Sequence, residues 1–129
     1  MPVKHEIDDK SKLIKTNWSG EPSDAELIES FIRYQSDVRS KPGYDFYNEL
    51  VDFSEVSGVH VTVSGVKELV EIATRTDKKG VSSKLAIIVT SPLAVAIVRM
   101  YEILRSAKPT TQKKIRVFKN LADAYEWII

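Results

Sequence analysis

The polar side chains best suited to chemistry gather in one segment, Leu50 to Leu69, which reads LVDFSEVSGVHVTVSGVKEL. An apolar strand is predicted to end there on an acidic residue, and a polar loop and a helix start follow. We therefore expect five side chains around one strand end: Asp52, Ser54, His60, Thr62 and Ser64. In open α/β sheets, the crevice beyond the strand ends is the usual place for a ligand or a phosphorylated side chain. This segment is therefore the candidate surface for a ligand or a partner.

The residue types present give catalysis little support. The chain has no cysteine, and its two histidines, His5 and His60, fall in different predicted elements. No GxSxG or HExxH pattern accompanies either histidine. Strand alternation places His5 on the same strand face as apolar residues, which predicts a packed, hydrogen-bonded structural role. We predict no catalytic residue, no metal site and no cofactor, and an enzyme that uses His60, Asp52 and Ser54 is the remote alternative.

Composition and charge indicate the class of protein. The chain has 129 residues, of which 43% are apolar and 29% charged, so we expect one globular domain over residues 1–129. No apolar run approaches the roughly 18 residues of a membrane span, and the absence of cysteine fits a reducing compartment. We therefore predict a soluble, cytoplasmic protein.

The charge is unevenly distributed along the chain. Residues 1–77 hold nine basic and fifteen acidic side chains, whereas residues 78–129 hold ten and three. A basic half can face nucleic acid, an anionic membrane or an acidic protein. The densest basic group consists of Lys108, Lys113, Lys114, Arg116 and Lys119. No aromatic residues of the kind that stack on bases interleave with these charges, so we expect no nucleic-acid partner.

Changes in the apolar period predict the first elements. Two alternating segments, residues 3–8 and 14–18, flank a turn-like Asp8-Asp9-Lys10 and predict a β-hairpin. Ser23 and Glu26 have the spacing of a capping box, which starts a helix. The expected apolar stripe of this helix is Leu27, Ile28, Phe31, Ile32, Gln35 and Val38. Residues 41–43 end the segment, and residues 50–53 form a short buried strand.

The remaining chain alternates helices and strands. A helix over residues 66–73 runs out into polar residues 76–80, and the apolar run 85–89 predicts a strand covered on both faces. A hydroxyl of Thr90 or Ser91 caps a helix that starts at Pro92 and reaches about Ser106. A last strand at residues 115–118 and a terminal helix capped by Asn120 complete the order ββαβαβαβα. This order predicts an α/β fold: a five-stranded, mostly parallel sheet with an antiparallel N-terminal edge strand, and four helices.

Four segments carry a resemblance to a known family. They are LVDFSEV (50–56), SGVKEL (64–69), AVAIVRMYEIL (94–104) and VFKNLADAYEWI (117–128). Together they resemble the SpoIIAA-like superfamily of STAS domains, in particular small bacterial STAS/SEC14-like proteins. The resemblance covers nearly the whole chain and implies strand order 1-2-3-4-5. It also implies a non-enzymatic regulatory module that contacts protein through the loops after the third and fourth strands, where Ser91 lies.

The phosphorylation switch of the family does not carry over. Anti-sigma-factor antagonists of the superfamily have an Asp-Ser-Ser-Gly motif, whose first serine is phosphorylated to change partner binding. The matching stretch here is Thr62-Val63-Ser64-Gly65, so Val63 stands at the acceptor position. Thr62 and Ser64 remain as hydroxyls near a helix N-terminus, where a phosphate would be stabilised, and one of them is expected to cap the helix.

The predicted helix from Pro92 to Ser106 is apolar over most of its circumference, so we expect it to contact a second neighbour besides the sheet. That neighbour could be the terminal helix with Tyr125 and Trp127, a second copy of the chain, or an apolar ligand. Arg99 interrupts the apolar run and could pair with Glu102 or meet an anionic ligand. The alternative to a regulatory module is therefore a carrier or sensor of a small apolar or anionic, lipid-like ligand. It predicts an apolar cavity that reaches Met100, Tyr101 or Trp127.

Overall fold

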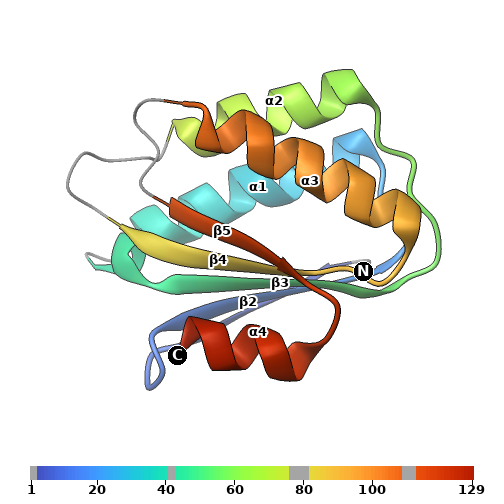
Figure 1. Ribbon diagram of the computed structural model, residues 1–129. Coiled ribbons are helices and arrows are strands. Elements are labelled where there is room, and N and C mark those ends of the chain that lie inside the picture. The colour runs from blue at the N-terminus through green and yellow to red at the C-terminus, as the bar shows by residue number, and fades with distance from the viewer. Residues whose placement is uncertain (1–2, 41–42, 76–81, 109–112) are drawn as a thin grey trace.

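A five-stranded mixed sheet forms the centre of the computed structural model, which describes residues 3–40, 43–75, 82–108 and 113–129 (Figure 1). The strands lie in the order β1-β2-β3-β4-β5; β1 is antiparallel to β2, and the other neighbours are parallel. The strands are β1 (Val3–Asp8), β2 (Leu13–Gly20), β3 (Asn48–Val56), β4 (Ser83–Ile88) and β5 (Lys113–Phe118). The helices are α1 (Asp24–Arg39), α2 (Val63–Thr74), α3 (Pro92–Ser106) and α4 (Leu121–Ile128), with a 3-10 turn η1 (Tyr44–Phe46). The predicted fold class and strand order are confirmed.

Side-chain caps start each helix as the sequence indicates. Ser23 and Glu26 form the complete capping box of α1. The hydroxyls of Thr62 and Ser91 accept backbone N–H bonds at the starts of α2 and α3, and the amide oxygen of Asn120 does so for α4. These bonds satisfy amides that have no partner inside the helix. The prediction that Thr62 or Ser64 caps its helix is confirmed, with Thr62 as the cap.

The helices are divided unequally between the two faces of the sheet. Helices α1, α2 and α3 cover one face, and α4 covers the other (Figure 1). Each of the first three connects neighbouring parallel strands, and right-handed crossovers in one direction place them all on one face. Helix α4 follows the last strand and is free of that constraint. The terminal helix is therefore not the second neighbour of α3, as one alternative proposed; α2 takes that place.

Two details differ from the sequence prediction. Strand β3 does not end at Phe53, as predicted, but continues to Val56, because β2 extends beside it and pairs Gly20 with Val56. In α1, Ile32 is 54% exposed, since the buried face is centred on Leu27 and includes the polar Ser30 and Gln35. The side chain of Val38 and the predicted stop signals at residues 41–42, 76–80 and 109–110 lie outside the described residues.

The helices of the described segments include none that is both long and apolar enough to cross a membrane.

Candidate ligand-binding cavity

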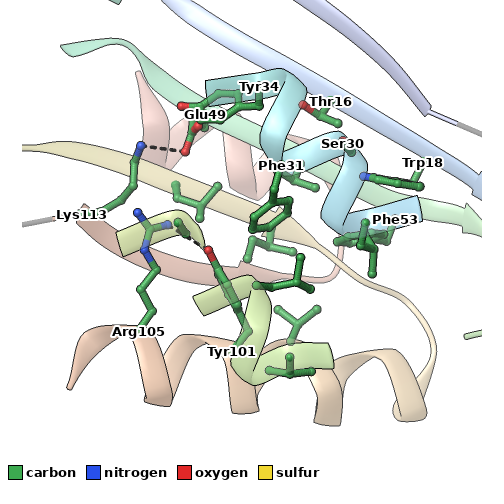
Figure 2. A pocket seen from close by; sticks show the side chains of 18 of the residues that line it. Thr16, Trp18, Ser30, Phe31, Tyr34, Glu49, Phe53, Tyr101, Arg105 and Lys113 are labelled. Carbon is green, nitrogen blue, oxygen red and sulfur yellow. Dashed lines mark hydrogen bonds and ion pairs between the residues drawn. The ribbon is translucent and has the colours of Figure 1, made fainter. Parts of the chain in front are cut away.

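A cavity of about 150 Å³ lies between the sheet and helices α1, α2 and α3 (Figure 2). Alternate residues of the strands supply its floor, because successive strand side chains point to opposite faces. The floor includes Trp18, Val51, Phe53, Leu85 and Ile87. The roof comes from the buried helix faces and includes Leu27, Phe31, Val66, Leu69 and Val98. The walls are therefore mainly apolar, as in small-molecule sites generally.

Aromatic pairs form part of these walls. The rings of Trp18 and Phe53 stack with centroids 6.2 Å apart, and those of Phe31 and Tyr101 meet edge to face at 6.0 Å. Trp18 is 2% exposed, so its ring is held almost entirely inside the protein. Rigid aromatic walls favour a flat apolar ligand, because ring contacts have defined geometry.

Charged side chains from the sheet form an ion pair at one end of the cavity. Glu49 on β3 and Lys113 on β5 are joined by an Oε2–Nζ distance of 2.7 Å, with both side chains about nine-tenths buried (Figure 2). Strand register places Glu49 beside Leu85 and Lys113 beside Ser83, so the pair crosses over the start of β4. The ion pair thereby joins two strands that are not neighbours.

Tyr101 and Arg105, one turn apart on α3, face this ion pair from the helix layer. The Arg105 guanidinium donates to the Tyr101 hydroxyl at 2.9 Å (Figure 2). Burial raises the pKa of Tyr101. The charge of Glu49 also raises this pKa, whereas the charges of Arg105 and Lys113 lower it. The hydroxyl is therefore protonated at neutral pH. We call the four residues Glu49, Lys113, Tyr101 and Arg105 the charged end of the cavity.

A second polar group lines the cavity beside β1 and β2. His5 is hydrogen-bonded through both ring nitrogens, Nδ1 to Thr16 Oγ1 at 3.0 Å and Nε2 to Ser30 Oγ at 3.1 Å. Burial lowers the pKa of His5, and the charge of Asp37 opposes this. The ring is therefore neutral at neutral pH, and the predicted packing and hydrogen bonding of His5 are confirmed.

Most residues of this site were not predicted from the sequence. Glu49 and Arg105 were not singled out, and Lys113 was named only as part of the basic group, although Glu49 and Lys113 could have been found. Glu49 alternates with Val51 and Phe53, and Lys113 alternates with Ile115 and Val117, so each shares a strand face with apolar residues. A charge on an apolar strand face indicates a buried, partnered group.

The five side chains predicted around one strand end, which we call the rim, are Asp52, Ser54, His60, Thr62 and Ser64, and two of them engage in local contacts. Thr62 donates its N–H and its hydroxyl to the Asp24 carboxylate at 2.9 and 2.6 Å, and its hydroxyl accepts from Gly65 N–H at 3.0 Å. A carboxylate of α1 therefore already occupies the place at the α2 N-terminus where a phosphate would bind. Asp52 accepts from the Ser54 N–H at 2.8 Å. Its position two residues from Leu50 places it on the α4 face of the sheet, away from Thr62.

The other predicted site residues are dispersed. His60 is exposed, and its Nε2 lies 3.5 Å from Glu21 Oε2. Ser64 is exposed on the first turn of α2. The Ser91 hydroxyl accepts from Ala94 N–H at 3.1 Å as the α3 cap. On α3, Arg99 is exposed and Met100 half-buried. Tyr101 is the predicted residue that lines the cavity, and neither Met100 nor Trp127 is part of the lining.

No site for a metal ion is formed by the part of the chain that the structure describes, where His, Asp and Glu side chains nowhere gather in groups of three or more.

Comparison with known proteins supports the fold alone. No family model and no curated protein matches the sequence. Among solved structures, an uncharacterised DUF3478 protein from Shewanella loihica with a SpoIIAA-like fold superimposes with a TM-score of 0.62 and 14% sequence identity. The alignment covers 98% of this chain and 94% of that one. The chain therefore has a SpoIIAA-like fold, as its resemblance to that superfamily implied.

Proposed function

We propose that this protein is a non-enzymatic binding module that holds one small, mainly apolar ligand between its sheet and its three-helix layer. The observation that carries the proposal is the cavity itself, which is apolar over most of its wall and has polar groups confined to defined places. This combination is the usual form of a small-molecule site. The proposal corresponds to the carrier alternative, with Tyr101 as the predicted residue that the cavity reaches.

The size of the cavity limits the ligand. Apolar cavities of about 150 Å³ in other proteins stay dry and bind benzene or xenon. The volume of this cavity is the same, about 150 Å³, so it fits roughly a single ring. A long acyl chain would require the helices to move away from the sheet. We therefore propose a compact cyclic or branched ligand rather than a lipid.

A role of the rim in protein contacts receives less support. The hydroxyl of Thr62 and that of Ser91 are used as helix caps, and Asp24 fills the α2 N-terminus. A protein partner at the loops after β3 and β4 stays a prediction, and the cavity is the stronger basis for function.

Tryptophan fluorescence tests the proposal directly. The chain has two tryptophans: Trp18 lines the cavity, and Trp127 on α4 contacts Phe118 beyond the opposite face of the sheet. In a Trp127→Phe background, toluene should change the Trp18 emission saturably. Ala73→Leu should remove this response, because the added side chain occupies the cavity that Ala73 lines. Ala96→Leu on the exposed face of α3 is the matched control and should leave the response intact.

No saturable response in the Trp127→Phe protein, or equal responses in both leucine variants, would contradict the proposed function.

A further inference from the structure

The ion pair at the charged end of the cavity is formed within the protein. The Glu49 carboxylate holds the Lys113 ammonium at 2.7 Å, and Arg105 donates to the Tyr101 hydroxyl at 2.9 Å. The ion pair spans β4 from β3 to β5. Pairing of both strands with β4 therefore fixes the positions of the two charged residues. A ligand that enters the cavity therefore finds the Lys113 ammonium already paired with Glu49.

Several other polar groups of the lining are also engaged. His5 bonds Thr16 and Ser30 through its two ring nitrogens, and the Gln35 side-chain amide donates to the Ile72 carbonyl. Buried groups that already have partners gain little from a polar ligand. They would lose a bond if a ligand displaced one of them.

Binding of a negatively charged ligand in this cavity would be energetically unfavourable. A ligand carboxylate would lose its hydration on entry and would lie near the Glu49 carboxylate, which already uses Lys113. Burial of a charge without its own partner is costly, whereas burial of a neutral ring or amide is far less so.

We propose that the cavity selects uncharged ligands over carboxylates of the same shape, and that Glu49 is the residue that sets this selectivity. The inference rests on the proposed function and specifies its ligand class. If Glu49 loses its charge, the Lys113 ammonium becomes available as the counterion of an anionic ligand. Glu49→Gln should therefore change the preference of the cavity and not only the stability of the fold.

Benzamide and benzoate are suitable probes, because they have nearly the same shape and differ in charge. Toluene serves as the apolar reference. In the Trp127→Phe protein at neutral pH, we expect benzamide to bind at least about tenfold more tightly than benzoate, which corresponds to ~1.4 kcal/mol. In Glu49→Gln this ratio should fall by at least about tenfold through tighter benzoate binding.

The outcomes separate the two proposals. If none of the three probes binds, the proposed function fails and the inference fails with it. If toluene binds but benzoate equals or exceeds benzamide, the selectivity is refuted while the proposed function stands. An unchanged ratio in folded Glu49→Gln would overturn the role of Glu49.

A second variant keeps the role of Glu49 testable if Glu49→Gln does not fold. Lys113→Gln removes the cation and keeps the acid, so the preference for benzamide should be at least as strong as in the parent protein. A weaker preference in this variant would refute the role of Glu49.

Discussion

Gly65→Ala should destabilise this protein, although alanine is ordinarily the better helix residue. Gly65 lies in the first turn of α2, where a Cβ would overlap the carboxylate of Asp24. That carboxylate accepts the N–H and the hydroxyl of Thr62 at 2.9 and 2.6 Å. To make room for the new methyl group, the Asp24 side chain must move away and give up both bonds.

The two opposing effects can be compared. Alanine in place of glycine in a helix is worth about 0.5–1 kcal/mol. Hydrogen bonds to charged groups contribute about 1.5–3 kcal/mol each. Asp24 is half-buried and Thr62 is exposed, which reduces the two bonds to about 2 kcal/mol together. The lost hydrogen bonds outweigh the gain in helix propensity, so Gly65→Ala should lower the free energy of unfolding by about 1 kcal/mol.

In an Asp24→Ala background the same substitution should have the opposite sign, because the three atoms nearest to the new Cβ all belong to the Asp24 carboxylate. There, Gly65→Ala should raise stability by about 0.5–1 kcal/mol. Urea denaturation of the four proteins measures this cycle, and a coupling near 2 kcal/mol exceeds the few tenths expected for independent sites. If Gly65→Ala stabilises both backgrounds equally, the carboxylate does not occupy the α2 N-terminus.

Two further predictions concern the lining of the cavity. Because burial lowers the pKa of His5 in the folded state, its contribution to stability is complete above the unfolded value of 6.5 and falls as pH decreases through it. Urea midpoints between about pH 7.5 and 5.5 should therefore fall more steeply for the parent than for His5→Gln, and parallel curves would contradict the buried neutral ring. Leu69→Ala, at a lining residue that is 5% exposed, should cost about 3 kcal/mol and enlarge the cavity. Saturating toluene should recover part of that loss in thermal unfolding and should not shift Ala73→Leu, whose cavity is filled; equal toluene shifts in these two variants would argue against this site.

Most of the fold was predictable from local pattern. Apolar alternation in β1 and β2, the unbroken run in β4 and the caps Ser23, Thr62, Ser91 and Asn120 each act over a few residues, so sequence spacing reveals them. The end of β3 was not predictable in this way. Residues 54–56 lie beyond the predicted segment, and pairing of Glu55 and Val56 with β2 depends on a strand distant in the sequence.

The site was harder to predict, because its defining contacts join distant residues. Glu49 and Lys113 are 64 positions apart, and their pairing depends on the register of both with β4. The rim residues Asp52, Ser54, His60 and Ser64 are close in sequence but do not converge. Asp24, which fills the α2 N-terminus, comes from a different helix. Residues close in sequence were therefore predicted as the site, whereas the cavity is formed by residues that are distant in sequence and packed together by the fold.

Strand β4 offers the most direct test of ligand binding between the sheet and the three-helix layer. Leu85 and Ile87 line the cavity, whereas Ala86 and Ile88 pack on the opposite side with α4. In methyl-labelled protein saturated with toluene, nuclear Overhauser effects from the toluene ring should reach Leu85 and Ile87 and be absent at Ala86 and Ile88. Contacts to Ile88, or to none of these four methyl-bearing residues, would contradict the account.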